Sequence, residues 1–249
     1  MQLKSPAKIN LTLDILGLDE RSDKHFANTI LYRHEEIFDD ITLKTNHSST
    51  NNLHIQGIRI PIRESNTVFQ ALKLLKVNGY DISIHKRIPP QSGLGGGSSN
   101  AATLLKYFGE QKGIPTFQLM ELARKIGADV PFFLCEGNLA YCEGFGDQIV
   151  QTWNIPSLDI TLIPTNIRVS SPEAYAQLNL KECGLNSVKT EALIKNLNAL
   201  KKSTLKSQPA DLIPFLHNDF ETEFFTKHPH WKGKGRLCGS GGYLWSLQT

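Results

Sequence analysis

The chain has 249 residues, 40% hydrophobic and 20% charged, and this ordinary globular composition excludes the disordered and fibrous classes. Lysine and arginine total 27 against 24 aspartates and glutamates, and a net charge of +3 gives no reason to expect a nucleic-acid partner. No run approaches the roughly 18 apolar residues that a membrane span needs. The first ten residues also lack the apolar core of a secretory signal. We therefore expect a cytoplasmic protein without a membrane or nucleic-acid partner.

The first predicted element is a strand with one apolar and one polar face. Apolar residues at odd positions from Ile9 to Ile15 alternate with polar residues at even positions from Lys8 to Asp14. Further strands are expected at Ile37–Leu43, Leu53–Ile62 and Ile82–Ile84. Helical spacing predicts a helix over Val68–Leu75 with Ser65 or Asn66 as its N-cap, a second over Ser99–Phe108, and a third over Phe117–Ile126 that stops at Gly127.

The second half continues this uneven mixture. Strands are predicted at Leu139–Glu143, Ile160–Ile163 and Tyr243–Ser246, and a helix through Leu193, Leu197 and Leu200. The early cluster of strands favours an α+β fold over a regular parallel βαβ array. A glycine-rich segment gives way to Pro156 and a new strand near residue 154, so we expect an N-terminal domain at 1–153 and a C-terminal domain at 154–249.

Neither the cysteines nor the histidines form a metal-binding pattern. The cysteines, at 135, 142, 183 and 238, contain no C-x-x-C pair, which favours free thiols in a reducing compartment over a disulfide framework. His228 and His230 have no nearby cysteine or carboxylate cluster, and we interpret them as part of a surface turn beside Pro229. We expect no dedicated metal cage.

A glycine-rich loop between the strand at Ile82–Ile84 and the helix at Ser99 is the most informative segment. Glycines let backbone N–H groups turn inward and approach a phosphate, and a helix that follows directly offers its free N–H groups and positive end to the same anion. A flexible linker would not be followed at once by a helix-forming run. We therefore expect polyphosphate binding by Pro89, Pro90, Gln91, Ser92, Gly93, Leu94, Gly95, Gly96, Gly97, Ser98 and Ser99.

The spacing of this loop excludes the two commonest nucleotide motifs. A P-loop requires a lysine after its last glycine, and none follows Gly97. The dinucleotide fingerprint requires a third glycine three positions after Gly95, where Ser98 stands instead.

Three motifs in order resemble those of the GHMP kinases, the family of galactokinase and the homoserine, mevalonate and phosphomevalonate kinases. They are Ser5–Leu11, the loop that runs from Pro89 or Pro90 to Ser99, and Leu237–Gly242. The resemblance implies a two-domain α+β kinase with a ribosomal protein S5 domain 2-like N-terminal domain and a ferredoxin-like C-terminal domain. It also implies ATP as the phosphate donor, with Mg²⁺ near Ser98 or Ser99.

Further segments resemble the GHMP kinases that phosphorylate the 2-hydroxyl of 4-diphosphocytidyl-2-C-methyl-D-erythritol, a CDP-linked sugar alcohol of non-mevalonate isoprenoid biosynthesis. These segments are Gly127–Phe133, Gly137–Asp147 and Asn218–Glu221. Where that subfamily has Asp-Gly-Tyr-His, this chain has Asp23-Lys24-His25. The segment from Phe225 to Leu237 is also shorter than the resemblance implies, so we expect a shortened C-terminal domain.

The resemblance implies Lys8 and Asp129 as the catalytic residues, since phosphoryl transfer to an alcohol needs a group that positions or deprotonates the hydroxyl. Without the resemblance, Asp129 could be a helix N-cap and Lys8 a solvated strand residue. The resemblance further implies substrate contacts from Asn10, His25 and Tyr175, although Tyr175 could equally pack its own short helix onto a sheet. Asn66 and Thr67 are weaker candidates for a position near the adenosine.

Other functions stay open from the sequence. A GHMP kinase for homoserine or mevalonate is one alternative, a catalytically silent nucleotide-binding homologue is another, and RNA binding is disfavoured because no cluster of basic residues accompanies the pI near 8.6. We expect a monomer or a weak homodimer with a small-molecule substrate.

Overall fold

The computed structural model describes residues 1–58, 65–201 and 209–248, apart from the side chains of 200, 201 and 209. The chain forms two compact units that alternate along the sequence. The first unit comprises Met1–Lys8, Arg33–Pro90 and Gly95–Cys135, and the second comprises Ile9–Tyr32, Gln91–Leu94 and Glu136–Thr249. These units are not consecutive halves of the chain, and the domain boundary expected between 153 and 154 stays a prediction.

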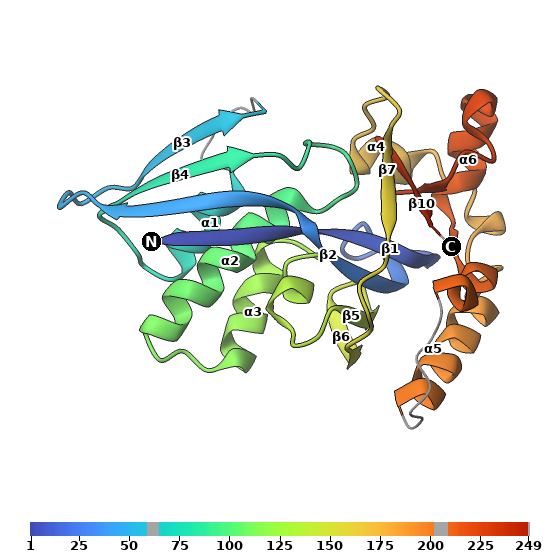
Figure 1. The fold of residues 1–249 in the computed structure, drawn as a ribbon, viewed down its shortest axis with the longest axis horizontal. Helices are drawn as coiled ribbons and strands as arrows, with labels where there is room; N and C mark the ends of the chain where they lie inside the picture. Colours follow the sequence, from blue (N-terminus) through green and yellow to red (C-terminus); the bar gives the residue numbers. More distant parts are fainter. Residues whose placement is uncertain (59–64, 202–208, 249) are drawn as a thin grey trace. The chain divides into compact units, whose positions relative to one another are not determined.

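A mixed sheet forms the first unit, in the order β3-β4-β2-β1. Its strands are β1 (Gln2–Asp19), β2 (Lys24–Thr45), β3 (Asn52–Gly57) and β4 (Tyr80–Lys86), with β1 and β2 continuing into the second unit. β4 runs antiparallel to β2, with Ile41 opposite Ile84, and parallel to β3, with Leu53 opposite Ile82. The helices of this unit cover one face of the sheet (Figure 1).

Those helices are α1 (Thr67–Leu74), α2 (Gly96–Gln111) and α3 (Thr116–Ile126), followed by the short 3-10 helix η1 (Pro131–Leu134). Of the two expected N-caps of α1, the structure selects Asn66, whose side chain accepts the Val68 N–H at 3.0 Å. The start predicted for α2 at Ser99 is wrong by three residues. Gly95 is the N-cap in a left-handed conformation, so Gly96 to Ser98 already form the first helical turn.

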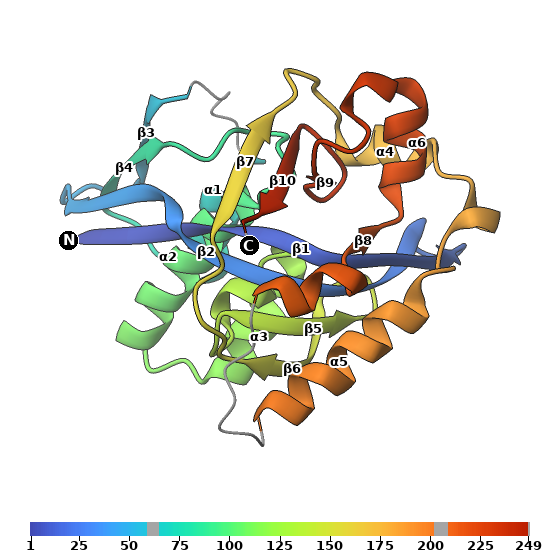
Figure 2. The same ribbon diagram turned by 45° about the vertical axis from the view of Figure 1, so that its right-hand side comes forward.

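The second unit contains most of the remaining elements. They are β5 (Leu139–Glu143), β6 (Gln148–Trp153), β7 (Ile160–Pro164), α4 (Ser171–Ala176), η2 (Leu180–Glu182), α5 (Ser187–Lys201), η3 (Pro209–Phe215), β8 (His217–Asn218), α6 (Phe220–Lys227), η4 (Pro229–Trp231), β9 (Arg236–Leu237) and β10 (Tyr243–Leu247). β7, β10 and β9 form an antiparallel three-stranded sheet, visible in Figure 2. β8 pairs in parallel with β1, and β5 pairs with β2 and β6.

Several expectations about strands are corrected by these bounds. The predicted strand Ile37–Leu43 is only part of the 22-residue β2, and β6 and α6 were not predicted. Of the expected strand Leu53–Ile62, β3 ends at Gly57 and positions 59–62 lie outside the described residues. The alternation in β1 is confirmed, but its polar face is as buried as its apolar one, since Lys8 and Asp14 are 4% and 0% exposed.

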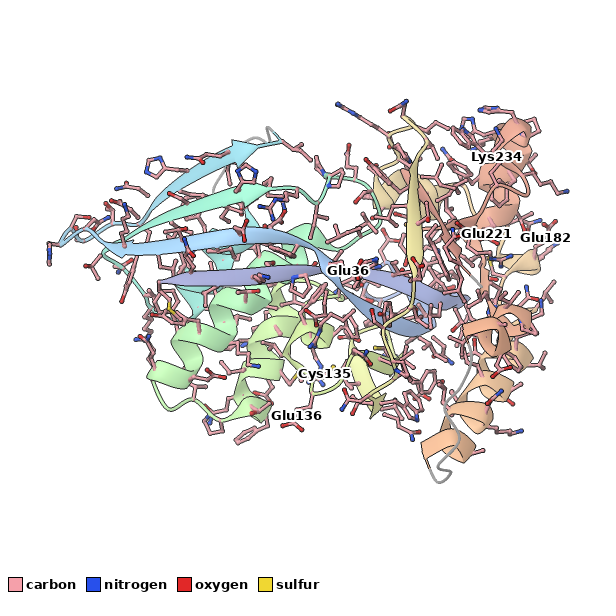
Figure 3. All side chains as sticks on the ribbon, viewed as in Figure 1. Glu36, Cys135, Glu136, Glu182, Glu221 and Lys234 are labelled. Carbon is pink, nitrogen blue, oxygen red and sulfur yellow. The ribbon has the colours of Figure 1, made fainter. Side chains whose placement is uncertain are left out.

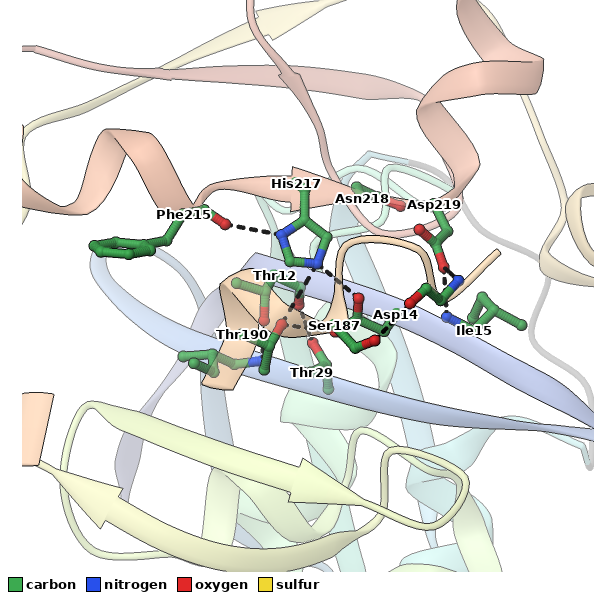
Figure 4. A network of polar contacts seen from close by, with 12 residues as sticks. Thr12, Asp14, Ile15, Thr29, Ser187, Thr190, Phe215, His217, Asn218 and Asp219 are labelled. Carbon is green, nitrogen blue, oxygen red and sulfur yellow. Dashed lines mark hydrogen bonds and ion pairs between the residues drawn. The ribbon is translucent and has the colours of Figure 1, made fainter. Parts of the chain in front are cut away.

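A buried polar network holds the second unit together (Figure 4). Asp14 on β1 accepts a hydrogen bond from the Thr190 hydroxyl of α5 at 2.6 Å and lies 2.8 Å from Nε2 of His217 on β8. Nδ1 of the same ring lies 2.8 Å from the carbonyl oxygen of Phe215. Buried polar groups must be paired to avoid a desolvation cost, so this network fixes α5 and β8 against β1.

A hydrophobic cluster that includes Phe220 and Phe224 packs α4 and α6 onto strands of the second unit. Glu221, labelled in Figure 3, pairs with Arg236 at 2.9 Å and accepts the Leu237 N–H at 2.8 Å, which joins α6 to β9. Burial raises the pKa of Glu221, and the guanidinium of Arg236 opposes that rise.

Candidate functional site

The backbone of the glycine loop is left-handed at alternate positions, with φ of +55° at Gln91, +77° at Gly93 and +70° at Gly95. Such alternation turns backbone N–H groups toward one side, as in anion-binding nests. Pro89 is half-buried, Pro90 is exposed, and Ser92 and Leu94 are buried.

The loop packs closely on the third motif inside the second unit. A Cβ at Gly93 would lie 1.8 Å from the carbonyl oxygen of Cys238, and a Cβ at Gly242 would lie 2.2 Å from the carbonyl oxygen of Gln91. No other residue type fits at either position without moving the backbone. These two motifs, far apart in the sequence, therefore form one glycine-lined backbone contact.

The start of α2 offers an anion site in the first unit. In a helix beginning at Gly96, the first N–H groups have no intrahelical acceptor and the helix dipole is positive at this end. The Ser99 N–H is already bonded to the Gly95 carbonyl at 2.9 Å, which leaves Gly96, Gly97 and Ser98 to face a ligand. Thr67 supports this turn, because its hydroxyl donates to the carbonyl of Gly97 at 2.8 Å.

Lys8 and Asp129 come together beside this helix start. Nζ of Lys8 lies 3.4 Å from Oδ2 of Asp129, and the two side chains are 5% and 36% exposed. A Cβ at Gly95 would lie 2.8 Å from Cγ of Lys8, which shows how closely the lysine stem packs on the loop. Asp129 does not cap η1, whose N-cap is Val130, so the alternative role as an N-cap is wrong.

The turn that carries Asp129 begins beside the first turn of α2, and the η1 helix that follows it ends at a hydrogen-bonded residue. At its beginning, a Cβ at Gly127 would lie 4.0 Å from the Ser98 hydroxyl oxygen. At its end, the Arg33 guanidinium donates to the carbonyl of Cys135 at 2.9 Å. The carboxylate of Asp129 is thereby presented next to the first turn of α2.

The two serines at the start of α2 differ in what they can bind. Ser99 is fully buried, and its hydroxyl accepts a hydrogen bond from Ser5 at 2.8 Å. Ser98 is half-buried, in the turn whose N–H groups face a ligand. No cluster of three or more metal-ligating side chains occurs among the residues that the structure describes.

The expected substrate residues lie in the second unit. His25 and Tyr175 stack on each other with ring centroids 4.7 Å apart, and Tyr175 also meets the edge of Phe220 at 4.9 Å. Tyr175 thus both packs α4 onto the cluster and contributes to an aromatic pair. The Asn10 amide donates to the hydroxyl of Thr29 at 2.9 Å and is buried on β1.

Sequence reasoning missed a group of buried polar residues behind the glycine loop. Asp39 on β2 and Lys86 at the end of β4 form an ion pair, and both contact Asn100 of α2. Burial lowers the pKa of Lys86, and the adjacent carboxylate of Asp39 opposes the change. No local pattern signals this pair, because its partners meet only through the register of β2 against β4, in which Asp40 lies opposite His85.

The expectations on cysteines and membrane segments can be compared with the structure only over the described residues. Within them no disulfide joins the thiols of Cys135, Cys142, Cys183 and Cys238. No helix in that part of the chain is long and apolar enough to cross a bilayer.

Comparisons with known proteins show the family and the fold. The family model for the GHMP kinases N terminal domain matches residues 66–137. The 4-diphosphocytidyl-2-C-methyl-D-erythritol kinase of Alkaliphilus metalliredigens is 34% identical over 236 residues, covering 92% of this chain and 77% of the relative. The enzyme of the same name from Francisella philomiragia is 34% identical over 265 residues, covering 98% of this chain and 86% of the relative.

Solved structures give the same result for the fold. A crystal structure of 4-(cytidine 5'-diphospho)-2C-methyl-D-erythritol kinase superposes with a TM-score of 0.73 at 26% identity, covering 99% of this chain and 90% of the other. Methanococcus jannaschii mevalonate kinase has a TM-score of 0.62 at 12% identity, covering 100% and 90%, and shares the fold.

The family model, these relatives and this fold show that the chain is a GHMP kinase, and the expected α+β architecture of that class is confirmed. Within the class, both relatives that match nearly the whole chain have the same enzyme name. The chain belongs to the 4-diphosphocytidyl-2-C-methyl-D-erythritol kinase family.

Proposed function

We propose that this protein uses ATP to phosphorylate the 2-hydroxyl of 4-diphosphocytidyl-2-C-methyl-D-erythritol, a step of isoprenoid precursor biosynthesis. The observation that carries the proposal is the Lys8–Asp129 pair, 3.4 Å apart, packed against Gly95 at the start of α2. A phosphate cradle next to an ion-paired carboxylate is what phosphoryl transfer to an alcohol requires.

The residues of the first unit divide the chemistry between them. Backbone N–H groups of Gly96 to Ser98 bind the ATP phosphates, where the helix dipole favours negative charge. Asp129 accepts the proton of the attacking hydroxyl, because its carboxylate lies beside Lys8 and remains 36% exposed to solvent. Lys8 orients that carboxylate and offsets negative charge on the transferred phosphoryl group.

The donor set also suits Mg²⁺, which prefers oxygen ligands and binds proteins through few side chains together with substrate phosphates. Ser98 would hold it, since the hydroxyl of Ser99 is already engaged by Ser5 in the interior. When bound, the ion neutralises charge on the phosphates.

For the cytidine, we propose that the base rests against the aromatic pair His25–Tyr175. A base stacked on an aromatic ring gains about 1–3 kcal/mol. The segment Asp23-Lys24-His25 lacks the tyrosine that the resemblance implies, so His25 and Tyr175 supply the aromatic surface in this chain. Asn10 would position the sugar alcohol.

The test is ADP release with 4-diphosphocytidyl-2-C-methyl-D-erythritol, mevalonate and homoserine in parallel, followed by ³¹P NMR to locate the new phosphate. We expect turnover of the cytidine substrate only. Turnover of mevalonate or homoserine instead would assign another GHMP activity, and ATP binding without turnover of any would indicate a silent homologue.

The variant Asp129→Asn tests the mechanism. We expect kcat to fall about 10²–10⁴-fold, as for loss of a positioned acid–base group, while the protein stays folded. The matched control is Asp40→Asn, which alters another partly exposed carboxylate, 41% exposed and 2.7 Å from Arg87. Wild-type turnover in Asp129→Asn would remove Asp129 from the mechanism.

A further inference from the structure

Behind the glycine loop, one buried carboxylate gathers an unusual set of donors. Asp39 is fully buried on β2 and accepts the backbone N–H groups of Arg87 at 2.8 Å and Ile88 at 2.9 Å. It also accepts Nδ2 of Asn100 at 2.9 Å and Nζ of Lys86. None of these contacts is used by the proposed chemistry.

The partners of Asp39 lie at the two ends of the loop. Arg87 and Ile88 directly precede it, and Asn100 lies in the second turn of α2, which follows it. The network continues from Nδ2 of Asn100 to the hydroxyl of Ser5 at 2.8 Å and from there to Ser99 at 2.8 Å. The carboxylate of Asp39 therefore links the two ends of the segment 89–99. A segment that is ordered before a ligand arrives loses less conformational entropy when the ligand binds.

The charge of Asp39 also affects the electrostatics at the start of α2. A Cβ at Gly96 would lie 3.1 Å from Nζ of Lys86, so the ammonium lies beside the first turn of α2. A lone cation there would oppose the positive end of the helix dipole. The carboxylate of Asp39 pairs with this ammonium and so offsets its charge beside the helix start.

A role in stability alone accounts for this arrangement less well. Buried ion pairs are weak stabilisers, because desolvation offsets much of their attraction, and apolar residues of similar size often replace them without loss. The hydrogen bonds of this carboxylate are instead directed to both ends of the loop.

We propose that Asp39 is a positioning residue for ATP, which holds the glycine loop in its phosphate-binding conformation before the nucleotide arrives. This inference rests on the proposed function, because it assumes that the loop binds ATP. Asp39 touches neither substrate and acts through Asn100 and the backbone of residues 87 and 88.

Hydrogen exchange of the ATP-free wild-type protein gives the first test and needs no substitution. The backbone N–H groups of Leu94 and Ser99, which are bonded to the Ser92 hydroxyl and the Gly95 carbonyl, should exchange slowly compared with those of an unstructured peptide. Exchange at the unprotected rate would overturn the inference, because the loop would not be formed in advance.

Two variants give the second test. Asp39→Asn removes the charge, and Asp39→Asn with Lys86→Met removes both charges at nearly constant volume, so the second keeps the test valid if the first does not fold. We expect faster exchange over 89–99 and a KM for ATP raised about 10- to 100-fold, as for loss of hydrogen bonds to a charged group, with the KM for the alcohol unchanged. A binding assay with a fluorescent ATP analogue should show the same shift.

The matched control is Asp14→Asn, which alters a carboxylate equally buried in the other network. It should lower the melting temperature without changing exchange over 89–99. An equal rise in both KM values, or unchanged exchange and ATP affinity in folded Asp39 variants, would overturn the positioning role. Wild-type protein that fails to bind ATP would instead refute the proposed function, and the exchange data would still show whether Asp39 orders the loop.

Discussion

Replacing Gly95 by alanine should separate the placement of Lys8 from the stability of the fold. Gly95 has φ of +70°, and a Cβ there would lie 2.8 Å from Cγ and 3.3 Å from Cε of Lys8. The left-handed conformation costs an alanine about 1–2 kcal/mol, which for a chain of this size lowers the melting temperature by about 2–8 °C. The contact at Cγ adds a displacement of the lysine, because Cγ lies mid-chain and cannot swing away alone.

That displacement should be visible in catalysis. The Lys8 ammonium is 3.4 Å from Asp129, and a misplacement of about 1 Å at a reacting centre can cost 10²-fold in rate. We expect Gly95→Ala to lose about 10²-fold in kcat, measured as ADP release at saturating ATP and alcohol.

Gly113→Ala is the matched control, because it isolates the backbone cost. Gly113 has φ of +63°, and a Cβ added there would meet nothing within 4 Å among the described residues, so the variant should lose similar stability and no activity. Equal turnover by Gly95→Ala and Gly113→Ala would show that the loop does not set the position of Lys8, and the argument for the catalytic pair would fail.

Two further predictions concern the second unit. Tyr175→Ala should raise the dissociation constant of CMP about 5- to 150-fold, because a stacked base is worth about 1–3 kcal/mol. Tyr175→Phe keeps the ring and should retain binding. Equal affinities of the two variants in calorimetry would contradict base stacking. Burial raises the pKa of Asp219, so above about pH 4 the folded state binds more protons than the unfolded state and stability falls as pH rises. Asp219→Asn keeps an acceptor for the N–H groups of Ile15 and Gly184, and urea unfolding between pH 4 and 7 should show that it removes this fall.

The sequence predicts local features of the fold well where the chemistry is local. The loop and the N-cap at Asn66 follow from residue types with strong local preferences. α3 does stop at Gly127 as predicted, but this glycine is extended with φ of 175°, a conformation open to any residue. The start of α2 was misplaced because glycines at 96 and 97 argue against a helix by propensity. The contacts that α2 makes with neighbouring elements override that preference, as the hydroxyl of Thr67 does at Gly97.

The site depends on distant contacts that no local pattern encodes. Lys8 and Asp129 are 121 positions apart, and only the resemblance to GHMP kinases suggested pairing them. Asp39 and Lys86 meet through strand register, and a register is set by whole strands rather than by the residues that it brings together. The sequence could therefore indicate the phosphate loop but not the network behind it.

The glycines of the loop also differ in purpose, which their uniform appearance in the sequence conceals. Gly93 is required by backbone packing, since a Cβ would meet the carbonyl oxygen of Cys238 at 1.8 Å, and Gly95 is required by the stem of Lys8. Gly97 is exposed and helical, and a Cβ there would meet only the Thr67 hydroxyl oxygen at an ordinary 3.5 Å among the described residues. Protein packing therefore does not explain a glycine at 97, whereas close approach of a phosphate to the first turn of α2 does. Among the glycines of the loop, Gly97 therefore gives the most direct support for nucleotide binding.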